Sequence, residues 1–211
     1  MNDVSLALQH PHASPVRHWL SEMTAAAPDL RQQYYQNLLA HADGAVDSDW
    51  LAQIVASWQA GQGALPDTLG LGEAAYNQLL QQRFPGYCLD SRSQTGKSID
   101  FSRMLEKQDL EQYLRRYAVQ VDQNSEWIIA LIVAACLGSD HLWQDLGLWS
   151  RRELSALLNH YFPVLAALNN KDMKWKKFIY KQLCEAEGLY VCRAPSCEVC
   201  QDYPKCFGAE E

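Results

Sequence analysis

"WIIALIVAACL", residues 127–137, is the longest apolar run of the chain and the stretch that decides its fold. Eleven residues of this kind are too few to span a bilayer, but they suit a helix buried in a protein core. Ser125 stands before the run as a candidate N-cap, and Gly138 follows it where a helix commonly ends. The run therefore predicts a central apolar helix on which other elements pack.

The segments around this run also show helical spacing of apolar residues and no convincing alternation of the kind that strands show. Pro163 indicates the start of a further helix, and Asp172 is the candidate N-cap of another helix that Gly188 closes. The other predicted helices are "PVRHWLSEMTAAA" (15–27), "DLRQQYYQNLLAHA" (29–42), "DWLAQIVASWQA" (49–60), "EAAYNQLLQQRF" (73–84) and "LEQYLRRYA" (110–118).

The predicted fold class is therefore all-α. We expect a helical bundle over residues 1–188, with a polar loop or linker at 86–100. An irregular cysteine-rich segment, residues 189–211, follows the bundle and is expected to pack on it as a loop that holds a metal cluster. The two prolines and four cysteines of this segment replace helical periodicity, so its shape would come from a bound ligand.

Composition excludes several classes of partner. The 211 residues are 48% hydrophobic and 20% charged, which is ordinary for a globular protein, and the net charge is −7. An acidic chain is not expected to bind nucleic acid or an anionic membrane in general. The first residues lack the basic start and apolar stretch of a secretory signal, so we expect a cytoplasmic protein.

The cysteines gather near the C-terminus. Five of the seven lie in the last 28 residues, and the first 87 residues contain none. An odd number in a chain without an export signal disfavours a disulfide framework, because the cytosol keeps thiols reduced. A metal site is the better interpretation. Four of them form a single run, "CRAPSCEVCQDYPKC", with the spacing Cys192-x4-Cys197-x2-Cys200-x5-Cys206.

Two kinds of metal centre fit this run. Zinc accepts four thiolates, but its usual sequence pattern is two close pairs separated by a longer loop. Single runs are typical of iron–sulfur sites, in which one irregular loop surrounds a cluster. The spacing therefore favours iron–sulfur over zinc and leaves both open.

A lysine-rich segment directly precedes the cysteines. Residues 171–181 contain five lysines and one aspartate, a local charge of +4 in an acidic protein. On a helix, Lys174, Lys177 and Lys181 would fall within about 60° of one another. This stripe is either a solvated helix face or a surface for an anion or an acidic partner beside the metal site.

Several motifs in order resemble one known family. The cysteine run followed by Phe207-Gly208 looks like the C-terminal signature of the NifQ nitrogen-fixation proteins, and "HLWQDLGLWSRREL" (141–154) and "YFPVLAALNNKDMKWKKFIYKQLCEAEG" (161–188) resemble the same family. The resemblance covers residues 141–208. It implies a carrier that is not an enzyme, an iron–molybdenum–sulfur protein that donates molybdenum for assembly of the nitrogenase iron–molybdenum cofactor.

The resemblance also implies partners and ligands. The partners would be the cofactor-assembly scaffold and the nitrogenase iron protein, with molybdate or another molybdenum source. The thiolates of a Mo–Fe–S cluster would come from Cys192, Cys197, Cys200 and Cys206. Cys184 could be a further ligand or a small buried residue, and His141 could donate a nitrogen to molybdenum or cap a helix end. The competing functions are a small iron–sulfur electron-transfer protein and a zinc-stabilised interaction domain.

Overall fold

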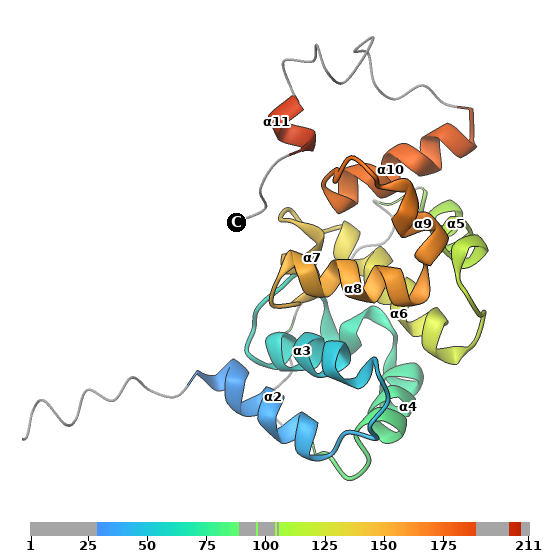
Figure 1. The fold of residues 1–211 in the computed structure, drawn as a ribbon. Coiled ribbons are helices and arrows are strands. Elements are labelled where there is room, and N and C mark those ends of the chain that lie inside the picture. The colour runs from blue at the N-terminus through green and yellow to red at the C-terminus, as the bar shows by residue number, and fades with distance from the viewer. Residues whose placement is uncertain (1–28, 89–95, 97–103, 105, 189–202, 208–211) are drawn as a thin grey trace, which may run out of the picture.

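The computed structural model describes residues 29–88, 96, 104, 106–188 and 203–207, and its regular structure over these residues is entirely helical (Figure 1). The all-α prediction is confirmed for this part of the chain. The helix predicted at 15–27, most of the loop at 86–100 and Cys192, Cys197 and Cys200 lie outside it. The elements are α2 (Leu30–Ala40), α3 (Ser48–Gln59), η1 (Asp67–Gly70), α4 (Glu73–Arg83), α5 (Lys107–Tyr117), α6 (Gln123–Cys136), α7 (Leu142–Leu146), α8 (Arg151–Tyr161), α9 (Pro163–Leu168), α10 (Trp175–Ala186) and α11 (Tyr203–Cys206).

The apolar run forms α6, the central helix of the fold. Its side chains are buried almost all round, including Trp127, which is among the largest fully buried residues. Helices α5 and α7 pack against α6, α2 packs on α3, and α8 packs on α9. A helix that is apolar on every side must be covered by neighbours. The prediction of a central core helix at 127–137 is therefore confirmed.

The predicted cap of α6 is wrong by three residues. Asp122 is the N-cap, and its side chain accepts a hydrogen bond from the amide of Ser125 at 2.9 Å. The Ser125 hydroxyl in turn accepts from the Asp122 amide at 2.9 Å. These reciprocal bonds form a capping box, which satisfies two amide groups at once and starts the helix at Gln123.

The start of α10 also differs from prediction. Pro163 does open a helix, α9, as expected. Asp172, however, is not the cap of α10, because it has a left-handed φ of 54° and the helix begins only at Trp175. The Asn169 side chain bonds both the amide and the carbonyl of Met173 at 2.8 Å, which extends the turn and makes Lys174 the N-cap.

The end of α10 matches the expectation. The helix stops at Ala186, and Gly188 has the left-handed φ of 72° that favours glycine after a helix. Over the described ranges, no helix has both the length and the apolar character needed to cross a bilayer.

Candidate functional site

A cavity of about 480 Å³ lies where the beginning of α10 faces the turn between α6 and α7. Its walls come from residues 138–142, from the first turn of α10 and from α11. Lysine is the residue type that dominates the lining, and two separate elements supply it. The four lysines are Lys174, Lys176, Lys177 and Lys205.

Lys176 holds the two walls together. Its Nζ donates to the carboxylate of Asp145 and, at 3.0 Å, to the carbonyl oxygen of Gly138. Asp145 is 3% exposed, and its carboxylate also accepts from the amide of Asp140 at 3.1 Å. Removal of either partner of a buried ion pair is destabilising, because it leaves the other charge away from water without a partner. The pair fixes α10 against the turn that follows α6.

Gly138 is needed at this junction. A Cβ atom built on Gly138 would lie 2.3 Å from Cγ of Asp145, closer than non-bonded carbon atoms approach. Only a residue without a side chain lets Asp145 reach Lys176. The glycine that the sequence suggests as a helix end therefore has a second role in positioning the ion pair.

The last cysteine of the run is docked beside the same cavity. The amide of Lys174 donates to the carbonyl of Cys206 at 2.8 Å, and Phe207 is only 4% exposed in the main core. Cys206 itself is half-buried and packs at the edge of the core. Figure 1 shows α11 next to the beginning of α10. These contacts anchor the end of the cysteine segment and bring Lys205 to the cavity.

His141 lines the cavity and also occupies a capping position. It is the N-cap of α7, and its amide donates to Oε1 of Gln144 at 3.1 Å. His141 therefore occupies the capping position that one interpretation gave it, through its backbone amide. The interpretation of His141 as a metal ligand stays a prediction.

The structure separates the other predicted residues. Lys174 and Lys177 both line the cavity, although Lys174 precedes the helix and so does not belong to a helical stripe. Lys181 lies farther along α10 and pairs with Glu185 at 3.3 Å. Cys184 is half-buried about 10 Å along the helix axis beyond Lys177 and is not one of the residues that line the cavity.

The remaining thiol near the site lies in surroundings that disfavour its thiolate form. Burial raises the pKa of the Cys136 thiol to about 12, and the nearby Lys176 offsets only part of this effect. The neutral thiol behaves as a small hydrophobic group. Within the described residues, no three His, Cys, Asp or Glu side chains lie close enough together to hold a metal ion.

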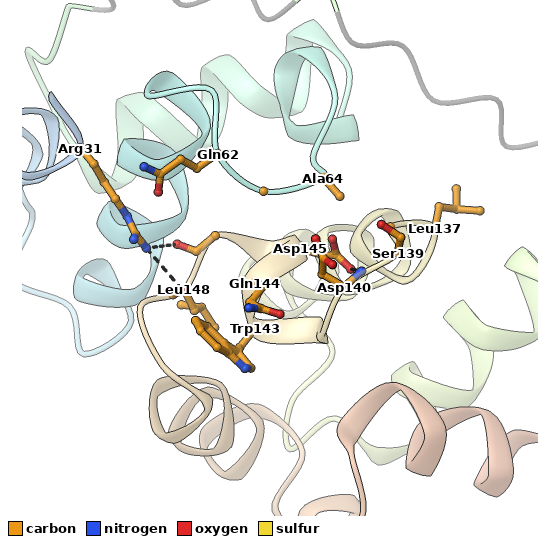
Figure 2. Close-up of a pocket in the computed structure, with 13 residues that line it drawn as sticks. Arg31, Gln62, Ala64, Leu137, Ser139, Asp140, Trp143, Gln144, Asp145 and Leu148 are labelled. Atoms are coloured by element: carbon orange, nitrogen blue, oxygen red, sulfur yellow. Dashed lines mark hydrogen bonds between the residues drawn. The ribbon is translucent and has the colours of Figure 1, made fainter. Parts of the chain in front are cut away.

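A second cavity, of about 610 Å³, shares residues 138–140 and Gln144 with the first (Figure 2). Its cation is Arg31, which donates to Oγ of Ser57 at 2.8 Å and to the carbonyl of Gly147 at 3.1 Å. Burial lowers the pKa of Arg31, and its guanidinium lies 4.8 Å from the Trp149 ring centroid. The hydrogen bonds of Arg31 join α2 to α3 and to the loop after α7, which is a structural role. We therefore place the candidate site at the lysine cavity.

Sequence reasoning missed two contributors to this site. Asp145 is a single aspartate inside "HLWQDLGLW", and nothing in that stretch indicates a partner 31 residues away. Lys205 stands between Pro204 and Cys206. The cysteine segment that contains Lys205 comes directly after the lysine-rich helix. This order along the chain was the signal that could have linked Lys205 to the other lysines.

The class that the fold and the site define is a protein that is helical over its described residues and whose Cys206, the last cysteine of the run, is bonded to the edge of a lysine-lined cavity. A family model described as NifQ matches residues 50–208, which include the cavity and all four cysteines of the run. The chain belongs to the NifQ family, a family of nitrogen-fixation proteins. The family match therefore extends well before residue 141, where the resemblance of individual motifs begins.

Curated relatives agree with this assignment. Protein NifQ of Azotobacter vinelandii is 44% identical over 171 residues, covering 76% of this chain and 88% of its own length. A NifQ homolog of Sinorhizobium fredii is 35% identical over 76% of this chain and 70% of its own. Protein NifQ of Klebsiella pneumoniae is 34% identical over 75% and 97%. No solved structure matches the chain.

Proposed function

We propose that this protein is a carrier, not an enzyme, that holds molybdenum in an iron–sulfur cluster and donates it for assembly of the nitrogenase iron–molybdenum cofactor. The observation that carries the proposal is the position of Cys206. A member of a four-cysteine run is anchored at a cationic cavity, in a chain that belongs to the NifQ family.

The donor set suits this cargo. Thiolates are soft ligands that hold iron in iron–sulfur clusters, and they also suit reduced molybdenum. Cys192, Cys197, Cys200 and Cys206 would supply the thiolates. An oxygen or nitrogen donor at the molybdenum corner would leave that metal weakly held, as a molybdenum donor requires, and His141, which lines the same cavity as Lys205, is our candidate for it.

The proposed partners follow from the same role. Molybdate or another molybdenum source would load the protein, and the cofactor-assembly scaffold and the nitrogenase iron protein would take part in the transfer. The four cavity lysines form a cationic surface in an otherwise acidic chain, which suits an anionic source or an acidic partner. We propose a cytoplasmic location, where reduced thiols persist.

The test is elemental analysis of protein purified without oxygen from molybdate-supplied cells. We expect iron, sulfide and molybdenum to be bound together, and to be lost together in Cys197→Ala and Cys200→Ala. Cys88→Ala is the matched control, because Cys88 is exposed and stands outside the run. Cluster-loaded protein should then pass molybdenum to the purified scaffold.

Other compositions would refute the proposal. Iron and sulfide that never acquire molybdenum, together with reversible reduction, would indicate an electron-transfer protein. Zinc alone in the anaerobic preparation would indicate a structural domain, and its removal by a chelator should then unfold the C-terminal segment.

A further inference from the structure

We infer that a further cavity, of about 430 Å³, is the docking site for a lysine or arginine side chain of a partner protein. The cavity lies between residues 45–47, just before α3, and residues 119–124, where α5 leads into α6. The last residues of α4 and α8 complete its lining. The inference goes beyond the proposed function and does not rest on it.

Acidic side chains dominate the charge of this cavity. Asp47 and Asp122 line it, and Arg83 is the permanent cation among its lining residues. Arg83 already has two carboxylate partners, Asp43 at 3.0 Å and Asp47 at 2.9 Å. Three carboxylates thus stand against one guanidinium, a formal charge of −2 when His160 is neutral. Since like charges repel one another, a further cation would be attracted to this place.

Both lining carboxylates have an oxygen that is available to a ligand. Asp47 is only 4% exposed, and its Oδ2 accepts from Arg83 and from the Tyr161 hydroxyl. Oδ1 of Asp122 accepts from the amide of Ser125. Within the part of the chain that the structure describes, Oδ1 of Asp47 and Oδ2 of Asp122 accept no hydrogen bond. Buried polar atoms are normally hydrogen-bonded, so Asp47 indicates a donor that enters the cavity.

The two carboxylates act on the same point. Burial, the hydrogen bond to Asp47 and the charges of Asp47 and Asp122 raise the pKa of Tyr161 well above its ordinary value, and Arg83 offsets only part of this effect. The Tyr161 hydroxyl therefore keeps its proton and donates it to Asp47. Because both charges act at this hydroxyl, one ammonium or guanidinium group in the cavity would be attracted by both.

Exposed valines surround the acidic centre. Val46 and Val119 line the cavity, and Val121 lies between Gln120 and Asp122, which line it as well. The three valines are between 58% and 71% exposed, and they are half of the large hydrophobic residues that the described part of the chain exposes. Single exposed apolar residues are ordinary, but a group of them beside a cavity is typical of a binding surface.

This combination defines the chemistry of the ligand. Lysine and arginine carry a charged head on an aliphatic stem, so the stem can cover the valines while the head reaches the carboxylates. A cavity of about 430 Å³ has room for such a side chain. A free amine of that size would leave most of the valine surface in water, whereas a protein segment would cover it. The occupant is therefore a side chain of a partner protein, presented between apolar residues.

The experiment is a nuclear magnetic resonance titration of the isotope-labelled full chain with a blocked peptide that carries lysine between two valines. We expect saturable shifts of the amide signals of Val46, Val119 and Val121. The dissociation constant should rise about tenfold in Asp122→Asn, which removes a charge and keeps a good N-cap residue. Asp140→Asn removes an exposed charge outside this cavity and should stay within about twofold of the wild type.

Val119→Ser tests the apolar rim. It should weaken binding about threefold, because it removes apolar surface from the contact. Val164→Ser is the matched control, since Val164 is similarly exposed on α9 and does not line the cavity. Both valines are exposed, so unfolding curves should show both variants folded.

Four outcomes would overturn the inference. These are the absence of saturable shifts, shifts confined to other parts of the chain, equal losses in Asp122→Asn and Asp140→Asn, and equal binding of a peptide with glutamate in place of lysine. Butylammonium that binds as tightly as the peptide would overturn the assignment to a protein and indicate a small free amine. None of these results depends on the molybdenum content, so the inference and the proposed function fail separately.

Discussion

Two clusters of charge in this molecule are built differently. Around Arg83, which is 8% exposed, the guanidinium donates to Asp43 at 3.0 Å and to Asp47 at 2.9 Å, and the Tyr161 hydroxyl donates to Asp47. At the lysine cavity one ion pair, Lys176–Asp145, is buried, and three more lysines stand around it. Acidic groups outnumber the cation in the first cluster, whereas cations outnumber acidic groups in the second. The first suits a role in folding, whereas the second gathers lysines from two elements at one cavity.

The largest effect is expected from Asp145→Asn, which removes the counter-charge of the cavity cluster. Lys176, whose side chain is 17% exposed, would be left charged and largely buried, at a cost of about 3 kcal/mol in the free energy of unfolding. Urea unfolding measures this difference. Asp140→Asn changes an exposed carboxylate on the same turn and should cost less than about 0.5 kcal/mol. Equal effects of the two substitutions would contradict the structural role of Asp145.

Arg83→Met removes the cation of the other charge cluster. It leaves Asp43 and Asp47 without their cation, and we expect a smaller loss of about 2 kcal/mol, since Asp43 is partly exposed and the pair is not fully desolvated. The molybdenum and iron content of the anaerobically purified protein should be unchanged, because Arg83 does not line the lysine cavity. A variant that lost both stability and bound metal would show that the two clusters are not independent.

The same variant should change the response to acid. Burial alone would raise the pKa of Asp43, but hydrogen bonds from Ser48, the Ala45 amide and Arg83 together lower it below its ordinary value. A carboxylate with a lowered pKa stabilises the fold above its unfolded pKa, about 3.9, and this contribution is lost as the pH falls through the folded value. Unfolding curves between about pH 3 and 7 should therefore fall less steeply in acid for Arg83→Met. A steeper fall would contradict this account.

Gly138→Ala should have an intermediate effect. The added methyl group would push Asp145 away from Lys176, and overpacking of this kind costs about 1–3 kcal/mol. The variant should be less stable than Ser139→Ala, which alters an exposed neighbour on the same turn. Thermal unfolding of the two proteins compares them. No difference would mean that Asp145 can shift without cost.

The smallest effect is expected from Glu185→Gln. Lys181 and Glu185 are both exposed and one helical turn apart, and such pairs contribute about 0.5 kcal/mol or less. Chemical denaturation should place this variant within that range. A larger loss would show that α10 is stabilised more by its exposed face than by the cavity cluster.

Local sequence signals were sufficient for the helices. The apolar run at 127–137 predicts α6, and Pro163 predicts the start of α9. The ends of helices depend on finer choices. Ser125 is a good capping residue, but Asp122 takes the position because the two side chains satisfy each other's amides, and Asn169 delays the start of α10 by binding Met173. In both cases, hydrogen bonds between residues three or four positions apart decide where the helix begins. They outweigh the preference of a single residue for the cap position.

The candidate site could be predicted only in part. The lysines were visible as a charged segment and Cys206 as a member of a spaced run, but their contact depends on the bond between Lys174 and Cys206, 32 positions apart. The partner of Lys176 could not be inferred, because the chain offers many carboxylates and only packing brings Asp145 into reach. Long-range pairs of this kind depend on the fold as a whole, and no short motif encodes them.

The bond between the Lys174 amide and the Cys206 carbonyl has a thermodynamic consequence. It connects a residue of the cysteine run to a residue of the cavity. If a ligand at either site displaces Cys206 or Lys174, it changes the affinity of the other site, and linkage requires the same factor in both directions. Loading of the cysteines and docking of an anionic source or an acidic partner at the lysines would then change each other's affinity by one and the same factor.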